Sequence, residues 1–203
     1  MSTLKNKAFD KNKLRKLALC GIFFAIIIVM TFVPYTGYIS TGLIAITTLH
    51  VIVIIGSVML GWKYSIALGA MWGIMCVIRA ATSGSAENIL FINPLISVLP
   101  RLFVGLVAAL VFKALYKTKL GVIGGCIGAA IAGTLTNTIL VISAIYIFGG
   151  MIKEFKDAFE IVKTVMGIII SVNGAVALSV AVVLTPAIVR PLYPMLKKNG
   201  IMD

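Results

Sequence analysis

Four polar side chains interrupt long apolar stretches of this sequence, and their types favour binding of a small anion over bond-making chemistry. They are His50, Arg101, Asn137 and Asn173. A guanidinium group binds a carboxylate through two parallel hydrogen bonds, and amide and imidazole groups add neutral hydrogen bonds. A polar group in apolar surroundings is costly unless it faces a partner or an aqueous cavity. The four residues therefore predict a binding site.

Arg101 is the strongest of these candidates, because the chain offers no acidic partner within the apolar stretches. The acidic residues all lie outside them: Asp10, Glu87, Glu154, Asp157, Glu160 and Asp203. Pro100 removes the helical hydrogen bond to the carbonyl of Ile96, so we expect a kinked backbone there. Arg101 either anchors an anionic ligand or extends its guanidinium toward the nearer boundary of the apolar stretch.

The other polar residues each have a structural alternative. Asn137 and Asn173 can bridge helices through hydrogen bonds, and His50 can cap a neighbouring carbonyl group. Arg79 follows the third apolar stretch and Asn93 precedes the fourth, so both flank the mouth of the predicted site. Arg79 also suits an anchor at the boundary between lipid and water.

The elements that carry these residues are six predicted transmembrane helices. Apolar residues make up 61% of the 203 positions and charged residues only 12%, whereas soluble domains have about 25% charged residues. Nearly charge-free runs of about 17 residues or more indicate spans. They cover residues 17–33, 43–60, 64–78, 94–112, 120–148 and 164–189. We therefore predict an all-α integral membrane protein whose residues 1–203 form one membrane domain, with tails at 1–16 and 191–203.

The placement of the basic residues predicts the orientation of these helices. The net charge is +12, but the charge lies between apolar blocks rather than in a patch typical of nucleic-acid binding. In a six-span arrangement, one side carries Lys5, Lys7, Lys11, Lys13, Arg15, Lys16, Lys63, Lys113, Lys117, Lys119, Arg190, Lys197 and Lys198. The positive-inside rule puts that side, with both termini, in the cytoplasm. The four polar residues then lie roughly 10–17 Å below the outer ends of their helices.

Several classes of function find no support in the sequence. The spacing of Gly56 and Gly61 matches a phosphate-binding loop, but Trp62 stands where that motif needs lysine. Single cysteines at Cys20 and two other positions lack metal-ligand spacing. The basic first segment and its apolar run also resemble a signal peptide, but no cleavage pattern follows. Acidic residues within the membrane are common in ion-coupled carriers, so their absence from the predicted spans weakens that alternative.

Two outer segments could cover the predicted site. Residues 34–42 carry no charge and include Tyr38, with Gly37 and Gly42 as possible hinges. Residues 151–162 place apolar and charged side chains on opposite helical faces, which is typical of a segment that lies on the membrane surface or over a pocket.

Small residues mark faces where helices can approach closely. Gly69 and Gly73 form one GxxxG pattern, which we expect to serve internal packing. Ala18, Gly21 and Ala25 share one face of the first span. This face either packs internally or meets another protein, because it adjoins the basic cytoplasmic tail.

Two segments of the sequence resemble a known family. They read LHVIVIIGSVMLGWKYSIALGAMWG, which begins just before His50, and FINPLISVLPRLFVGL, which contains Asn93 and Arg101. Both are similar to the substrate-binding S components of energy-coupling factor vitamin transporters, and most similar to those specific for pantothenate. Where the family often has AxxxA on its first helix, this chain has Gly21 followed four residues later by Ala25.

The resemblance implies a function that fits the predicted site. S components bind a vitamin from outside, beneath the loop between their first two helices, which makes Tyr38 a candidate contact. They bind no ATP: a transmembrane coupling subunit and two cytoplasmic ATPase subunits supply the energy, so no cofactor is expected in this chain. The location implied is a prokaryotic plasma membrane.

The resemblance also implies how a vitamin would be held. The carboxylate of pantothenate suits Arg101, and its hydroxyl and amide groups suit the asparagines. Riboflavin and folate are alternatives, and a folate also carries carboxylates, whereas riboflavin has no net charge to pair with Arg101. An ion-coupled small-molecule carrier is a further alternative.

Overall fold

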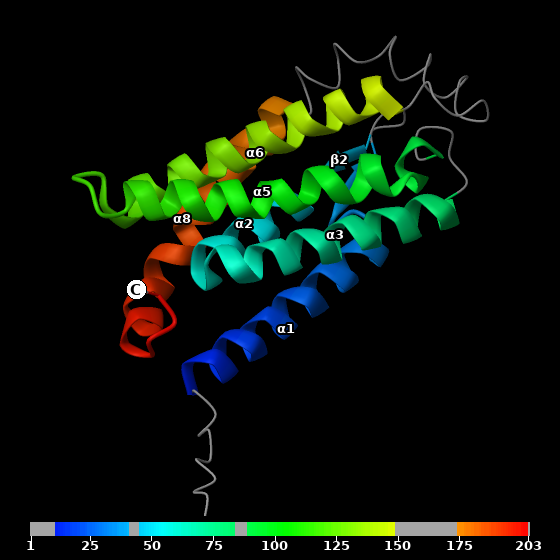
Figure 1. Cartoon of the computed structure of the whole chain (residues 1–203). Coiled ribbons are helices and arrows are strands. Elements are labelled where there is room, and N and C mark those ends of the chain that lie inside the picture. Colours follow the sequence, from blue (N-terminus) through cyan, green and yellow to red (C-terminus); the bar gives the residue numbers. More distant parts are fainter. Residues whose placement is uncertain (1–10, 41–44, 84–88, 149–173, 203) are drawn as a thin grey trace, which may run out of the picture.

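The computed structural model describes residues 11–40, 45–83, 89–148 and 174–202, and these residues form a helical bundle (Figure 1). Its helices are α1 (Lys11–Phe32), α2 (Leu49–Leu60), α3 (Trp62–Ser83), α5 (Pro94–Leu115), α6 (Gly121–Phe148) and α8 (Gly174–Lys198). A short 3-10 helix, η1 (Leu90–Ile92), precedes α5. All of these α-helices except α2 are long and apolar enough to cross a membrane. The predicted all-α membrane class is confirmed.

A small hairpin connects α1 to α2. Its strands β1 (Tyr38–Ser40) and β2 (Ala45–Thr47) pair antiparallel, with Tyr38 opposite Thr47. The backbone N–H of Thr48 donates to the carbonyl of Gly37 at 3.0 Å, which closes the base of the hairpin. A side chain at Gly37 would collide with the Met30 carbonyl at the end of α1. The described part of the uncharged loop predicted from the sequence, residues 34–40, therefore packs against α1.

The predicted beginning of the second span is wrong. We predicted one helix over 43–60, but α2 begins at Leu49, and residues 45–47 belong to β2. Twelve helical residues rise only about 18 Å, against roughly 30 Å of hydrocarbon. An uninterrupted apolar run fits a strand as well as a helix, so hydropathy could not find the boundary.

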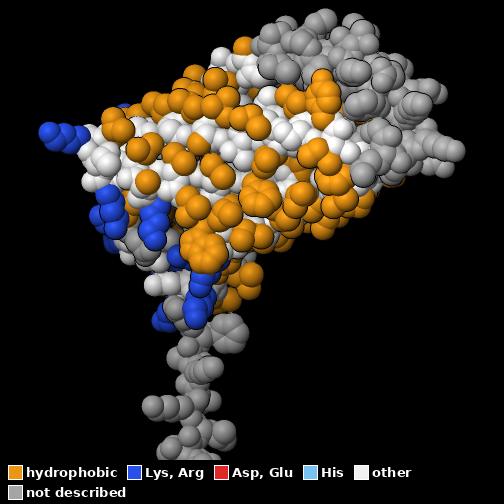
Figure 2. All heavy atoms as spheres, turned by 45° about the horizontal axis from the view of Figure 1, so that its top comes forward, with side chains coloured by type: hydrophobic (Ala, Val, Ile, Leu, Met, Phe, Trp, Pro, Cys, Tyr) orange, Lys and Arg blue, Asp and Glu red, His pale blue; other side chains and the backbone are white. Residues whose placement is uncertain are grey.

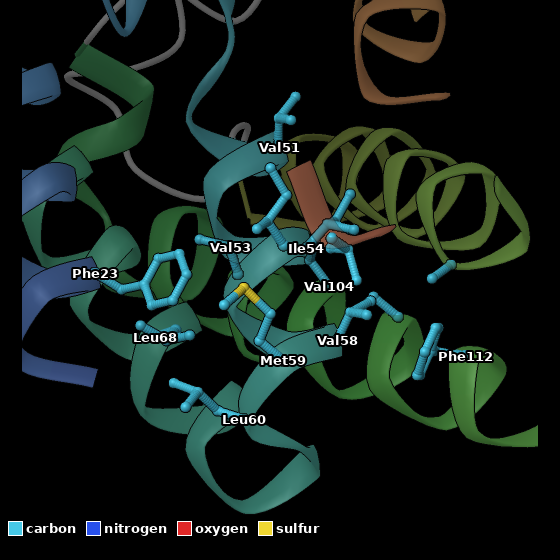
Figure 3. Packing of buried hydrophobic residues seen from close by; sticks show 14 of the residues in the cluster. Phe23, Val51, Val53, Ile54, Val58, Met59, Leu60, Leu68, Val104 and Phe112 are labelled. Carbon is cyan, nitrogen blue, oxygen red and sulfur yellow. The ribbon is translucent and has the colours of Figure 1, made fainter. Parts of the chain in front are cut away.

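The short helix α2 is the core of the bundle. All of its residues except Ile52 are buried. Figure 3 shows its apolar side chains on several sides of the helix, facing Phe23 of α1, Leu68 of α3 and Val104 of α5. A helix that is apolar all round is a buried helix, so the longer helices shield α2 from lipid.

The other predicted spans match the helices, with differences at their ends. The predictions 94–112 and 120–148 agree closely with α5 and α6, whereas α1, α3 and α8 extend into predicted loops or tails. The predicted spans end next to basic residues such as Lys16, Lys63 and Arg190, which nevertheless remain helical. A hydropathy search finds the apolar part of a helix and stops where the helix leaves the hydrocarbon. Residues 164–173 of the sixth predicted span lie outside the described residues.

Glycines allow α3 to approach α5 closely. A Cβ atom at Gly69 would collide with the carbonyl of Arg101, and one at Gly73 would lie 2.6 Å from the Cα of Val98. The expectation that this GxxxG pattern serves internal packing is confirmed. The same contact fixes the backbone of α5 at Arg101, where the polar site is centred.

The two ends of the described chain lie together. Arg15 Nη1 near the start of α1 donates to the carbonyl of Asn199 at 3.1 Å, and Gly200, at φ 65°, packs against Asn12. Figure 2 shows Lys and Arg side chains gathered at one end of a largely apolar surface. Both ends are thus on one side of the bundle, as six alternating helices require. That this side faces the cytoplasm stays a prediction.

Candidate functional site

Arg101 is buried in α5, about two turns after the helix begins. Only 5% of the residue is exposed. Its Nη1 donates to the carbonyl of Ile96 at 2.7 Å. This is the carbonyl that Pro100 leaves without its usual helical donor. The proline therefore exposes a backbone acceptor, and the arginine next to it in sequence partly satisfies that acceptor.

Two aromatic rings lie beside the Arg101 guanidinium. Its Cζ is 5.2 Å from the ring centroid of Trp72 on α3 and 5.4 Å from that of Phe91 in η1. The negative face of an aromatic ring attracts a cation at such distances. Sequence reasoning missed both residues. The sequence did contain one signal for Trp72: this tryptophan lies between Gly69 and Gly73, in a helix expected to pack closely at the depth of Arg101.

The site retains hydrogen-bonding groups that are not satisfied. Arg101 Nε and the indole Nε1 of Trp72 are buried and have no hydrogen-bond partner among the described residues. None of the described residues is an aspartate or a glutamate. Within the described parts of the chain, the positive charge of Arg101 is therefore met by a carbonyl and two aromatic rings only. An incompletely compensated cation in a buried site favours an anion that can reach it.

Tyr38 and Arg79 lie on the side of this site that is formed by the hairpin. The Arg79 guanidinium lies 3.8 Å from the centroid of the Tyr38 ring, and the Tyr38 hydroxyl contacts Cys76 Sγ at 3.0 Å. Burial raises the pKa of the Tyr38 hydroxyl well above its ordinary value, although the nearby charges of Arg101 and Arg79 lower it. Tyr38 is therefore a neutral group that holds the hairpin against α3. Arg79, which we expected as an interface anchor, is half-buried and stacked on it.

The two candidate site asparagines that the structure describes, Asn93 and Asn137, have different roles. Asn93 caps α5, because its side chain accepts a hydrogen bond from the N–H of Leu95 at 2.9 Å and Pro94 occupies the first helical position. Asn137 lies on α6, which packs along α5. Its Oδ1 is buried and has no hydrogen-bond partner in the described part of the chain. Asn137 therefore has a free acceptor, whereas the side-chain oxygen of Asn93 already has a partner.

His50 joins α2 to α8. It is 1% exposed, and its Nε2 lies 3.3 Å from the carbonyl of Ala177. This contact agrees with the alternative that His50 caps a neighbouring carbonyl. A contact between His50 and a ligand stays a prediction. Asn173, the fourth polar residue, lies outside the described residues.

The small-residue face of α1 is exposed. Ala18, Gly21 and Ala25 are accessible, and apart from the neighbouring backbone of α1 no described atom would lie within 4 Å of a Cβ at Gly21. On α1, the side chains buried in the core are those of Cys20, Phe23 and Ile27. The described part of the bundle thus leaves the small-residue face without an internal partner.

The arrangement can bind an anion rather than a metal ion. Among the described residues, no three His, Cys, Asp or Glu side chains are grouped to hold a metal. Cys20, Cys76 and Cys126 are buried free thiols. The groups available to a ligand are donors on Arg101 and Trp72 and the free acceptor of Asn137.

Comparison with known proteins places this arrangement in a family. Residues 15–189 match the family described as ECF transporter, substrate-specific component. The pantothenic acid transporter PanT of Lactococcus lactis subsp. cremoris is 32% identical over 197 residues, which cover 90% of this chain and 95% of the relative. The pantothenate transporter PanT of Leuconostoc mesenteroides subsp. mesenteroides is 26% identical over 205 residues, covering 95% and 98%.

These matches span nearly the whole chain and include every described polar residue of the site. They identify a transport protein rather than an enzyme, one that works with an energising module. The chain belongs to the family of substrate-specific components of energy-coupling factor (ECF) transporters, which are multi-pass proteins of the prokaryotic plasma membrane.

Proposed function

We propose that this protein is the pantothenate-binding subunit of an ECF importer, and that Arg101 binds the carboxylate of the vitamin. The observation that carries the proposal is the state of Arg101, which is buried and partly unsatisfied and has no acidic side chain among the described residues to pair with. The names of the two relatives support the choice of pantothenate over other vitamins.

The geometry of the guanidinium suits a carboxylate. The Ile96 carbonyl uses Nη1, which leaves the edge formed by Nε and Nη2 for a ligand. Two parallel hydrogen bonds from that edge match the two oxygens of a carboxylate. The Trp72 indole, which also has a free donor, lies beside the same guanidinium. Riboflavin has no carboxylate and would leave this charge uncompensated.

The remainder of pantothenate needs both donors and acceptors. The free Oδ1 of Asn137 can accept a hydrogen bond from a hydroxyl or amide N–H of the vitamin. His50 and Asn173 are the other proposed contacts within the bundle. At the mouth, Arg79, Asn93 and Tyr38 would border the entrance, with Tyr38 holding the hairpin over it.

Release into the cell would depend on partner subunits. We expect Ala18, Gly21 and Ala25 to contact a transmembrane coupling subunit, because this exposed face lets another helix approach closely. Two cytoplasmic ATPases would hydrolyse ATP, and this chain would bind no cofactor of its own.

Calorimetry with matched ligands tests the proposal. The purified chain is titrated with pantothenate and with pantothenol, which replaces the carboxylate by an uncharged alcohol. We expect pantothenol to bind at least tenfold more weakly, because it leaves the charge of Arg101 unpaired. In Arg101→Ala, the two ligands should bind with similar, weak affinity.

Two results would contradict the proposal in different ways. If pantothenate does not bind while a folate or riboflavin does, the vitamin is wrong and the family assignment stands. If pantothenate binds but the preference over pantothenol persists in Arg101→Ala, another residue binds the carboxylate. Arg190→Ala is the matched control, since it removes an exposed guanidinium from the basic end of the bundle, and the preference for pantothenate should persist in it.

A further inference from the structure

A groove lies at the basic end of the bundle, well separated in sequence from the Arg101 site. It has a volume of about 410 Å³ and runs between the start of α6 and the last turns of α8. Its lining consists of Leu120, Gly121, Val122, Ile123, Arg190, Tyr193 and Pro194. Most of this lining is apolar, and Arg190 is its only charged residue.

Further cations border this groove. Arg190 is exposed, and no hydrogen bond or ion pair joins it to another described residue. The Lys197 Nζ lies 6.0 Å from the centroid of the Tyr193 ring, which lines the groove, so a second positive charge lies beside it. Lys119 directly precedes Leu120 in the chain. The groove thus combines an apolar floor with a positively charged rim.

The groove lies where apolar and basic surfaces meet. Leu120 and Ile123 at its edge are 60% and 41% exposed, and Val183, farther along α8, is 64% exposed. Exposed apolar side chains of this kind face lipid in a membrane helix. Lys and Arg side chains gather at the same end of the molecule (Figure 2). Tyrosine is favoured at the level of lipid headgroups, which is where Tyr193 would then lie.

We infer that this groove binds an anionic phospholipid from the leaflet on the side of the chain termini. The phosphate would lie between Arg190 and Lys197, and the first carbons of an acyl chain would pack on Leu120, Val122 and Ile123. Basic pockets between membrane helices bind lipid headgroups in this way. A free phosphate ion would use the charges but leave the apolar lining uncovered, so the combination selects a lipid.

Native mass spectrometry of the purified chain tests the inference. The chain is incubated with phosphatidylglycerol, or with phosphatidylcholine of the same chain length, and bound lipid is counted. We expect the anionic lipid to bind in preference. Arg190→Gln should weaken its binding about fivefold, because each basic residue near an anionic surface contributes about 1 kcal/mol. The double variant with Lys197→Gln should lose roughly 25-fold.

Lys113→Gln is the matched control, since Lys113 is an exposed basic residue at the same end that does not line the groove. An equal loss in this control would overturn the inference, because the lipid would then respond to general charge. Equal binding of both lipids would also overturn it. Displacement of the lipid by inorganic phosphate at equal concentration would show a soluble-anion site instead. The unfolding temperature without added lipid verifies that each variant is folded.

Discussion

Arg101 and His50 are both buried, yet they differ in the hydrogen-bonding groups and charge that internal contacts leave unused. Arg101 belongs to α5, lies beside Trp72 of α3 and donates to the carbonyl of Ile96. His50 belongs to α2 and contacts the carbonyl of Ala177 on α8. With Nε2 donating, a neutral imidazole keeps only the lone pair of Nδ1, which has no hydrogen-bond partner within the described residues. Arg101 keeps an N–H donor and a full positive charge.

The difference shows that burial alone does not identify a ligand contact. What matters is the group left over once internal hydrogen bonds have formed. A neutral acceptor without a partner costs about 1–3 kcal/mol, whereas a buried charge that loses its partner costs about 3–5 kcal/mol. The α3–α5 side should therefore dominate ligand binding, and the α2–α8 side should contribute mainly to packing.

The largest expected effect is that of Arg101→Ala on pantothenate binding. Loss of one member of a desolvated charged pair, at about 3–5 kcal/mol, corresponds to a hundredfold or greater loss of affinity. Arg101→Lys should recover only part of this loss, because an ammonium lacks the planar fork. Calorimetry on purified variants measures both. Undiminished affinity in Arg101→Ala, with an unchanged unfolding temperature, would reverse the comparison.

A second prediction separates the two candidate site asparagines that the structure describes. Asn137→Ala removes a free buried acceptor and should weaken pantothenate binding by about 1–3 kcal/mol. Asn93→Ala removes the cap of α5 and should lower stability by about 0.5–2 kcal/mol. Binding and thermal unfolding are measured for both variants. If Asn93→Ala impairs binding more than Asn137→Ala does, the cap is itself part of the site.

A third prediction concerns the α2–α8 side directly. His50→Leu removes the contact with the Ala177 carbonyl and replaces the imidazole by an apolar side chain of similar size. We expect stability to fall by about 0.5–1.5 kcal/mol, as for one hydrogen bond, and pantothenate affinity to change less than in either Arg101→Ala or Asn137→Ala. A hundredfold loss of affinity would place His50 beside Arg101 as a principal contact.

The fold was predictable where sequence signals coincide. For α5, the Asn93–Pro94 pair marks the start, and the apolar run then continues almost to Lys113, so prediction and structure agree. For α2, the run from 43 to 60 has no such signal at its true beginning. Residues 45–47 form a strand because they pair with β1, and that pairing is a tertiary contact that local hydropathy does not contain.

The candidate site was predictable to a similar degree. Arg101 stood out as a charge within an apolar run, and the effect of Pro100 on the Ile96 carbonyl followed from proline chemistry. Trp72 and Phe91 did not stand out, because aromatic residues in spans are as common in packing as beside a cation. Their contact with Arg101 depends on the close approach of α3 and α5 at Gly69, which only the structure shows.

Gly21→Leu should have the smallest effect on vitamin binding, because it changes neither the surroundings of Arg101 nor those of His50. Gly21 is exposed, and apart from the neighbouring backbone of α1 no described atom would lie within 4 Å of a Cβ added there, so the first atom of the new side chain has room. Leucine also favours the helix over glycine by nearly 1 kcal/mol, so folding and affinity should persist.

Assembly with the coupling subunit should respond differently to Gly21→Leu. A large side chain on a face that admits a close helix forces overpacking, which costs about 1–3 kcal/mol, and complex formation should weaken roughly 5- to 100-fold. Co-purification with the coupling subunit and ATPases, together with vitamin uptake by cells, measures this. Ala187→Leu is the matched control, because it adds a similar side chain to an exposed face of α8. If both variants assemble and transport normally, the partner binds elsewhere. If Gly21→Leu instead weakens binding by the isolated chain, α1 contributes to the vitamin site, and ligand binding is not confined to the contacts around Arg101.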